Sequence, residues 1–210
     1  MVKLIGVTFP NVDGIETLED FVAYTARVSN PGNQMNVETA PKLLNYLRDN
    51  NHWSPFEMCN VVMEINTTRD IARQILRHRS FSFQEFSQRY AEVKARPKLR
   101  EARLQDKKNR QNSVQNTDAQ IAAFWEQHQN KVWETSWSAY QWALKNGIAK
   151  EQARAVLPEG LTPSTLYMNG TLRSWMHYCD LRTANGTQKE HQEIAKKCQE
   201  IIEGVLGGKV

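Results

Sequence analysis

The longest uninterrupted pattern in this chain is a helical apolar stripe between Asp118 and Asn146. Its apolar residues recur at intervals that fit 3.6 residues per turn, and Gly147 follows as the kind of residue that commonly ends a helix. A long helix is therefore predicted in the second half of the chain. The stripe consists of Ile121, Phe124, Trp125, Val132, Tyr140 and Leu144.

Strand and helix patterns alternate before this stripe. Segments 2–9 and 59–68 are rich in β-branched residues, which predicts two strands. Thr17 and Asp20 have capping-box spacing at the start of a helical pattern, and either threonine at the end of the second strand can cap a further helix. The predicted helices cover residues 17–29, 37–50 and 69–79.

Four further elements are predicted after the long helix. They are a helix over 151–158 ended by Pro158, a strand and turn over 162–171, a buried helix over 172–182, and an amphipathic helix over 188–206. No internal repeat is present in the sequence. Early alternation of strands and helices therefore gives way to a longer helical part.

Length and composition indicate one globular domain over residues 1–210, because 40% of the residues are hydrophobic and 24% are charged. Residues 91–117 are basic and amide-rich with almost nothing to bury, which predicts a flexible insertion. That insertion is either a solvated loop or a flap that closes over an anionic ligand. No apolar run reaches the roughly 20 residues of a membrane span, and the N-terminus lacks the apolar length of a secretory signal. A cytoplasmic protein is expected, in a host cytoplasm if the source is viral.

The net charge limits the possible ligands, and the spacing of the cysteines limits the possible disulfide and metal sites. A net charge of +4 favours anionic partners, but small phosphorylated ligands and nucleic acids both remain possible. Cys59, Cys179 and Cys198 have no C-x-x-C spacing, so neither a disulfide framework nor a zinc site is predicted. Buried or incidental thiols are expected, and no metal site.

The most informative short stretch is "RHRSFSFQEFSQRY", residues 77–90, which combines cations with aromatic rings. If the preceding helix continues to residue 79, Gln74, Arg77 and His78 share one polar edge. Arg79 would then diverge from Arg77 by about 160°, because successive helical residues rotate by about 100°. The stretch therefore predicts two subsites for anionic groups.

The second half of the stretch has the composition of a nucleotide-binding segment. In an extended strand, Glu85, Ser87 and Arg89 lie on one side and offer a carboxylate, a hydroxyl and a guanidinium fork. An ion-paired surface hairpin with buried phenylalanines is the structural alternative. A nucleotide-binding enzyme and a small α/β nucleic-acid binder both fit these residues.

Several common sites are missing from the sequence. It contains no G-x-x-x-x-G-K-[ST] loop, no G-x-G-x-x-G after the first strand and no H-E-x-x-H. His128 and His191 fall on predicted helix surfaces, where a solvated role is expected. The residues therefore support neither a P-loop enzyme nor a Rossmann dinucleotide site nor a zinc protease.

The stretch resembles R-H-R-x-x-S-x-N-E-x-S-x-R-Y, the signature of the flavin-dependent thymidylate synthases, the ThyX family. Four further segments resemble the family's motifs in the expected order over most of the chain. They are "HWSPFEM" (H-x-[ST]-P-F-E), "ARQILRHR" (the lead-in helix), "ARAVLP" (A-R-x-V-L-P) and "LRSWMHYCDLR" (R-x-x-x-[NH]-x-x-x-x-R).

The resemblance implies an α+β fold, a mixed α/β core with a central sheet flanked by long helices, assembled as a homotetramer whose active sites combine several subunits. It implies reductive methylation of dUMP to dTMP, with methylenetetrahydrofolate as the one-carbon donor. NADPH would be the reductant, acting through bound FAD. The protein's share of such chemistry is binding, orientation and electrostatics. Neither a nucleic acid nor a membrane is implied as a partner.

The resemblance also assigns residues to the cofactor. Arg77 would lie near both the flavin and the nucleotide, and Gln84 stands where the motif usually has Asn. Thr171 and Asn169 compete for one flavin contact, because the link from Pro158 to Arg173 is one residue longer than in the family pattern. The implied cofactor-binding residues are His52, Ser54, Glu57, Arg77, His78, Arg79, Gln84, Glu85, Asn169, Thr171, Arg173 and His177.

On the substrate side, the resemblance implies that Arg182 is the catalytic residue at the uracil ring, where a fixed cation stabilises developing negative charge. Arg154 would reach dUMP from another subunit. The motif residues are kept, which argues against an inactive relative. The implied dUMP-binding residues are Gln74, Arg77, Glu85, Phe86, Ser87, Gln88, Arg89, Arg154 and Arg182.

Overall fold

A four-stranded antiparallel sheet lies at the centre of the computed structural model, which describes residues 1–94 and 96–207. The strand order is β1-β2-β6-β3. The predicted α+β mixture of a central sheet with flanking helices is confirmed. The single-domain prediction for 1–210 includes residues 95 and 208–210, which lie outside the described residues. The strands are β1 (Val2–Val7), β2 (Asn60–Thr68), β3 (Ser82–Glu85) and β6 (Pro163–Thr171).

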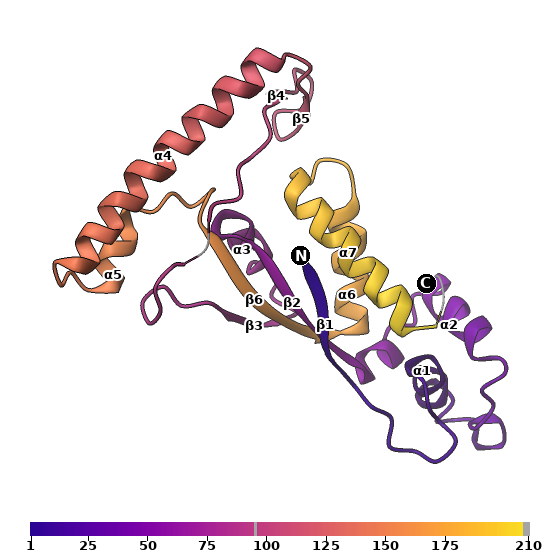
Figure 1. The fold of residues 1–210 in the computed structure, drawn as a ribbon. Coiled ribbons are helices and arrows are strands. Elements are labelled where there is room, and N and C mark those ends of the chain that lie inside the picture. The colour runs from indigo at the N-terminus through magenta and orange to yellow at the C-terminus, as the bar shows by residue number, and fades with distance from the viewer. Residues whose placement is uncertain (95, 208–210) are drawn as a thin grey trace.

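Helices surround the sheet unevenly (Figure 1). Helices α6 and α7 pack side by side next to the sheet, α1 and α2 lie together at one end, and α4 extends away from it. In the described part of the chain, no helix is both long and apolar enough to span a membrane. The helices are α1 (Leu18–Ala26), η1 (Pro31–Asn33), α2 (Ala40–Asp49), η2 (Ser54–Met58), α3 (Arg69–Ile75), α4 (Ala119–Lys145), α5 (Lys150–Ala153), η3 (Arg154–Val156), α6 (Leu172–Thr183) and α7 (Lys189–Val205).

The core forms where the apolar sides of β2 and β6 meet the helices. Met63 and Met168 are register partners on these strands, and both are fully buried. Trp175 of α6 is also fully buried, and its indole N–H donates to the Val61 carbonyl at 3.0 Å. Alternate strand residues thus point into one apolar layer, as expected for a sheet with one covered face.

All three cysteines are buried in this core, as predicted. Burial raises the pKa of Cys59 and of Cys179 to about 12, and it also raises the pKa of Cys198. Protonated, buried thiols are poor nucleophiles. The cysteines therefore contribute apolar volume.

Local signals correctly placed several helix ends. The Thr17 hydroxyl accepts the Asp20 N–H at 3.1 Å and caps α1. The Asp118 carboxylate accepts the N–H groups of Gln120 and Ile121 at 2.8 and 3.1 Å and caps α4. Caps of this kind satisfy backbone donors that have no partner inside the helix.

The long helix is confirmed, but most of its apolar stripe lies outside the core. Gly147 adopts a φ of +78° directly after the helix, where a residue without a Cβ is favoured. Tyr140 is buried, and it packs with Ala143 and the arm residue Val93. Leu144 is half-buried against the same cluster, and the other four are open because α4 extends past the sheet: Ile121, Phe124, Trp125 and Val132 are between 44 and 51% exposed.

Residues 91–117 bury little, as expected, and Val93 is the one buried residue among the described residues of the segment, but the segment has more regular structure than a loop. The segment contains a two-stranded hairpin, β4 (Arg103–Gln105) and β5 (Ser113–Gln115). Val93 is 4% exposed, and its N–H donates to the Tyr140 hydroxyl at 3.2 Å. Arg100 donates to the Asp70 carboxylate at 2.8 Å. Basic residues in this arm, which the sequence predicted as solvated, thus make specific ion pairs with the sheet domain.

Two predicted boundaries around the motif are wrong. Helix α3 ends at Ile75, so Arg77 and Arg79 do not continue its helical edge. Strand β3 ends at Glu85, so Ser87 and Arg89 are not aligned with Glu85 by strand alternation. After Glu85, turn hydrogen bonds replace the hydrogen bonds between strands. The Tyr90 and Ala91 N–H groups, for example, donate to the Ser87 carbonyl at 3.1 and 2.9 Å.

Two predicted elements after α4 also differ from the structure. The predicted helix over 151–158 is split into α5 and the 3-10 helix η3 before Pro158. The predicted strand and turn over 162–171 is one continuous strand, β6, and α6 begins directly after it. Pairing of β6 with β2 along its whole length holds Asn169 and Gly170 extended, although these residues favour turns in isolation.

We expect Gly170→Ala to lower the free energy of unfolding by about 1–3 kcal/mol, the usual range for an overpacked core. A Cβ at Gly170 would overlap the ring of Phe81, which packs at 4.8 Å from the ring of Trp175. Gly204→Ala is the matched control, because a Cβ there meets nothing within 4 Å. Urea unfolding of both variants tests this expectation, and equal midpoints would contradict it.

Candidate functional site

The arginine-rich motif leaves α3 through successive turns. The His78 N–H donates to the Ile75 carbonyl at 3.0 Å, and the Phe81 N–H donates to the His78 carbonyl at 3.3 Å. The buried Phe81 ring lies 5.9 Å from the ring of Tyr178, which anchors the turn on α6. Arg77 and Arg79 are exposed on either side of the half-buried His78. Packing of one phenylalanine thus positions Arg77, His78 and Arg79.

Arg182 and His78 form the centre of the site. The Arg182 Nε–H donates to His78 Nε2 at 2.9 Å, so His78 Nε2 carries no proton and the ring is neutral. Burial, followed by the charge of Arg182, lowers the pKa of His78 to about 4. Within the described residues Arg182 donates only through Nε, which leaves its two terminal nitrogens for a ligand. The site therefore presents a fixed guanidinium with its fork open.

His191 joins this centre, contrary to the prediction that it is solvated. Its side chain is fully buried, with Nε2 at 3.1 Å from the Tyr178 hydroxyl and Nδ1 at 3.3 Å from Gln74 Oε1. Burial, then the charges of Arg182 and His78, lowers the pKa of His191 to about 3. His128, by contrast, is exposed as predicted. We call Gln74, His78, Tyr178, Arg182 and His191 the Arg182 cluster.

The buried position of His191 has a sequence signal. His191 precedes Ile194, Ala195, Cys198 and Ile202 at intervals of 3, 4, 7 and 11 residues, which places it on the apolar face of α7. Tyr178 and Gln188, which also contribute to this region, have no comparable signal. Their roles depend on packing between elements that are far apart in the sequence.

A second group of predicted residues lies between η2 and α6. The Arg173 guanidinium forms an ion pair with Glu57, and Ser54 begins the same short helix η2. The His177 ring lies 4.6 Å from the ring of Trp53, an aromatic residue that the sequence analysis did not single out. His52, which precedes Trp53, lies 6.0 Å from the Tyr46 ring. These residues form a partly exposed surface of cations and rings.

The structure distinguishes the two candidates on β6. The Thr171 hydroxyl accepts the Ser174 N–H at 3.2 Å and thereby caps α6. The Oδ1 atom of Asn169 is buried and has no hydrogen-bond partner in the described part of the chain. The Thr171 hydroxyl is thus engaged as a helix cap, whereas Asn169 keeps an unpaired acceptor among the described residues.

Some of the predicted binding residues around β3 already form hydrogen bonds with other residues of the chain. Glu85 accepts from the Ser164 hydroxyl at 2.7 Å and from Arg69 at 3.4 Å. The Phe86 N–H is occupied by the Thr165 carbonyl at 2.9 Å. Gln88 is buried, with its Nε2 unpartnered among the described residues, whereas Gln84 and Ser87 are exposed.

Arg89 and Arg154 lie together but apart from the Arg182 cluster. Arg89 Nε lies 3.4 Å from the Glu151 carboxylate, and Arg154 Nε donates to the Glu151 carbonyl at 3.4 Å. Both residues are thus held at α5, beside the far end of α4, whereas Arg182 is on α6 (Figure 1). One chain does not bring all the predicted substrate residues into one place.

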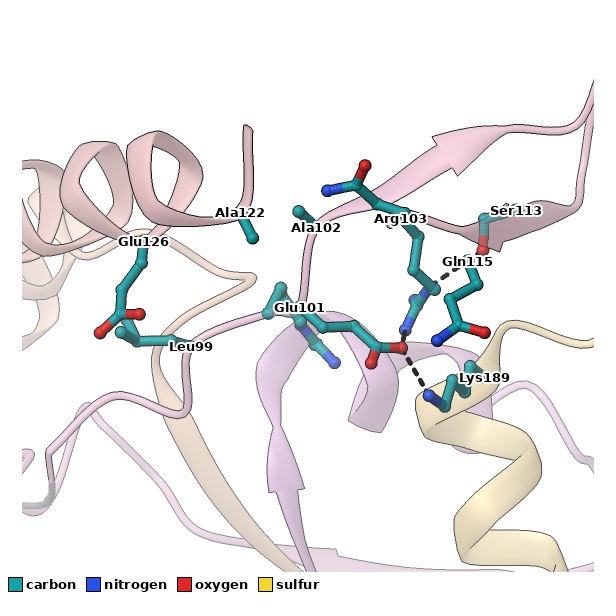
Figure 2. A pocket seen from close by; sticks show the side chains of 11 residues that line it. Leu99, Glu101, Ala102, Arg103, Ser113, Gln115, Ala122, Glu126 and Lys189 are labelled. Atoms are coloured by element: carbon teal, nitrogen blue, oxygen red, sulfur yellow. Dashed lines mark hydrogen bonds and ion pairs between the residues drawn. The ribbon is translucent and has the colours of Figure 1, made fainter. Parts of the chain in front are cut away.

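The hollow at the arm is a different region. It has a volume of about 750 Å³ and lies between β4, β5 and the N-terminal part of α4 (Figure 2). The Glu101 carboxylate accepts from Arg103 at 2.8 Å and from Lys189 at 2.6 Å inside it. None of the residues predicted for substrate or cofactor lines this hollow.

An open guanidinium beside neutral histidines, with Arg77 and Arg79 flanking His78 and aromatic rings nearby, is of the class that suits a ligand both anionic and flat. A family model described as thymidylate synthase complementing protein matches residues 12–206.

Two relatives match almost the whole chain. A probable flavin-dependent thymidylate synthase of Paramecium bursaria Chlorella virus 1 is 52% identical over 200 residues, which cover 95% of this chain and 92% of the relative. A flavin-dependent thymidylate synthase of Synechocystis sp. is 50% identical over 205 residues, covering 96% and 93%. The chain belongs to the family of flavin-dependent thymidylate synthases.

A solved structure supports the same relationship at the level of the fold. The crystal structure of the UMP/dUMP methylase PolB from Streptomyces cacaoi, bound with 5-Br dUMP, is 27% identical. It superimposes with a TM-score of 0.83 and covers 98% of this chain and 90% of its own. The sheet and helices described above are therefore shared with that solved structure.

We expect stability to fall as the pH is lowered from about 6.5 towards 4. The pKa values of His78 and His191 lie below their ordinary value of 6.5 in the folded protein, so over this range the unfolded chain takes up protons that the folded chain does not. The free energy of unfolding, measured by urea titration across this range, should therefore decrease. His191→Leu should flatten this pH dependence.

His128→Leu is the matched control, because His128 is exposed on α4. It removes a histidine without changing the Arg182 cluster. An equally steep pH dependence in His191→Leu and the wild-type protein would contradict the assignment.

Proposed function

We propose that this protein methylates dUMP to dTMP reductively, with methylenetetrahydrofolate as the one-carbon donor and NADPH as the reductant, through bound FAD. The observation that carries the proposal is the open fork of Arg182, held through its Nε by the neutral His78 at 2.9 Å. Membership of the flavin-dependent thymidylate synthase family supports the reaction. The methylase with bound 5-Br dUMP supports the substrate.

Arg182 acts on the uracil ring in this proposal. Its terminal N–H groups donate to a ring carbonyl oxygen and stabilise the negative charge that develops when the ring is activated. The hydrogen bond to His78 fixes the orientation of the guanidinium before the substrate binds. A neutral His78 is required, because a protonated ring could not accept from Nε and would repel the arginine. Gln74, which contacts His191, binds the base of dUMP in this proposal.

The other dUMP-binding assignments, Arg77, Glu85, Phe86, Ser87, Gln88, Arg89 and Arg154, remain part of this proposal. Glu85 is held by Ser164 and Arg69, so its carboxylate keeps one oriented edge for a sugar hydroxyl or a ring N–H. Arg89 and Arg154 provide guanidinium forks for the phosphate.

The residues present fit FAD. Asn169 has a buried Oδ1 without a partner among the described residues, which fits a donor supplied by a ligand. Arg77, Arg79 and His177 are exposed and can meet an anionic diphosphate, and Trp53 beside His177 offers a ring for a flat ligand. FAD, when bound, supplies the reducing equivalents delivered by NADPH. The remaining cofactor-side assignments are His52, Ser54, Glu57, His78, Gln84, Glu85, Thr171 and Arg173.

We further infer that the site is shared between copies of this chain in a homotetramer. Arg154 and Arg182 lie on different elements at separate places in one chain, so a second copy is needed to bring them together. The face of α4 made by Ile121, Phe124, Trp125 and Val132 is exposed, and a second copy is the occupant that we propose for it. Apolar surface of this kind is typical of an interface.

The chain would act as one domain in the cytoplasm, without nucleic acid or membrane partners. Its arm, residues 91–117, would then serve the folate, whose glutamate tail is anionic. Ion pairs of Arg100 and Arg103 with the sheet domain support a fixed position for the base of that arm.

The visible absorbance of the purified protein tests the proposed reaction. We expect a flavin spectrum that NADPH bleaches faster, under anaerobic conditions, when dUMP is present. Arg182→Ala should keep bound flavin but reduce dTMP formation by a factor of about 10² or more, because one preorganised charge is lost at the reacting ring.

Arg48→Ala is the control for this variant, because Arg48 lies on α2 and, among the described residues, its side chain hydrogen-bonds only to Asn45, at 3.5 Å. It should retain activity. A colourless protein that also fails to bind added FAD would refute the proposed function. Normal dTMP formation by Arg182→Ala would refute the role of that residue alone.

Val132→Asp should weaken self-association of the protein, because it places a carboxylate on the exposed apolar face of α4. Gln127→Asp introduces the same charge on α4 at an exposed polar position and should leave the assembly intact. Sedimentation velocity of both variants measures the effect. An unchanged tetramer in Val132→Asp, or a wild-type monomer, would contradict the proposed interface.

A further inference from the structure

A chain of hydrogen bonds connects the arm to Gln74 of the Arg182 cluster. Arg103 donates from both terminal nitrogens to the Glu190 carboxylate, at 2.8 and 2.9 Å. Gln188 Nε2 donates to the same carboxylate at 3.0 Å, and Gln74 Nε2 donates to Gln188 Oε1 at 2.8 Å. His191 Nδ1 then lies 3.3 Å from Gln74 Oε1. The chain therefore links a residue of the hairpin to the centre of the site.

The direction of every bond in this chain follows from the first carboxylate. Ionised Glu190 can only accept, so Gln188 must turn its NH₂ group towards it and its oxygen towards Gln74. Gln74 must then donate through Nε2 and turn its oxygen towards His191. His191 must carry its proton on Nδ1, and its Nε2 accepts from the Tyr178 hydroxyl.

Glu190 stays ionised over a wide pH range. Burial alone would raise its pKa, but hydrogen bonds from Arg103 and from its own backbone N–H, and the charge of Arg100, lower the pKa to about 2. Arg100 NH1 lies 3.4 Å from the carboxylate. The carboxylate that sets the direction of the chain is thus held by two arginines of the arm.

The amide of Gln74 is left with one free N–H and one free oxygen lone pair, in a fixed orientation. A uracil ring offers a carbonyl O4 and a donating N3–H, whereas a cytosine ring offers the reverse, an amino group and an accepting N3. A glutamine that can rotate its amide by 180° would match either ring. A glutamine held in one orientation matches only one of them.

We propose that Gln188 is a positioning residue that, through Glu190 and Arg103, fixes the amide orientation of Gln74 and so makes the site select uracil over cytosine nucleotides. This inference rests on the proposed contact of Gln74 with the base of dUMP. It adds a residue outside the assigned set, and it gives the arm a role in base selection.

Two variants test the proposal. Gln188→Met keeps the length of the side chain but removes the acceptor for Gln74. Gln199→Met makes the same exchange on α7, at a residue whose side chain hydrogen-bonds, within the described part of the chain, only to Glu203, at 3.1 Å.

The measurement is the dissociation constant of dUMP and of dCMP for each flavin-loaded variant, by calorimetric titration. We expect the ratio of dCMP to dUMP dissociation constants to fall roughly fivefold or more in Gln188→Met, the effect of about one hydrogen bond. Gln199→Met should keep the wild-type ratio. A purely structural role would weaken both nucleotides equally and leave the ratio unchanged.

The outcomes separate this inference from the proposed function. If the wild-type protein binds dUMP but Gln188→Met keeps the full ratio, the positioning role is refuted and the proposed function stands. If the wild-type protein binds flavin but does not bind dUMP, the proposed function itself fails, and the inference fails with it.

Discussion

The antiparallel pairing of β2 with β6 is the constraint on which the rest of this structure depends. Nine consecutive register pairs join Asn60–Thr68 to Pro163–Thr171, so the end of each strand lies beside the start of the other. Each strand runs directly into a helix, β2 into α3 and β6 into α6. The two helices therefore start from opposite ends of a ladder about 30 Å long and return along it. His78 after α3 and Arg182 near the end of α6 meet at 2.9 Å as a result.

The sequence contained enough information for elements whose signals are local. Thr17, Asp118 and Gly147 mark helix ends through their own hydrogen bonds or backbone angle, so α1 and α4 could be placed. The motif around His78 identified the chemistry because its residue types are unusual together. Boundaries such as Ile75 and Glu85 depended on packing of Phe81 against α6, which no local pattern contains.

Burial was the least predictable property. An apolar stripe indicates a helix, but the exposed Trp125 and the buried Tyr140 of α4 have the same pattern and differ only in what lies opposite them. Conversely, Arg100 and Arg103 were expected in solvent, and the carboxylates of Asp70 and Glu190 hold them against the domain. Charge complementarity between distant segments is invisible in a single sequence, whereas periodicity is visible.

The buried cysteines have a practical consequence. All three thiols lie in the core, and burial keeps Cys59 and Cys179 protonated at neutral pH with pKa values of about 12. The folded chain therefore has no thiol that reacts readily with maleimide or iodoacetamide reagents. A single cysteine introduced at the tip of the hairpin could carry a fluorescent or spin label without removal of the native ones. Motion of the arm could then be followed in the otherwise unaltered protein.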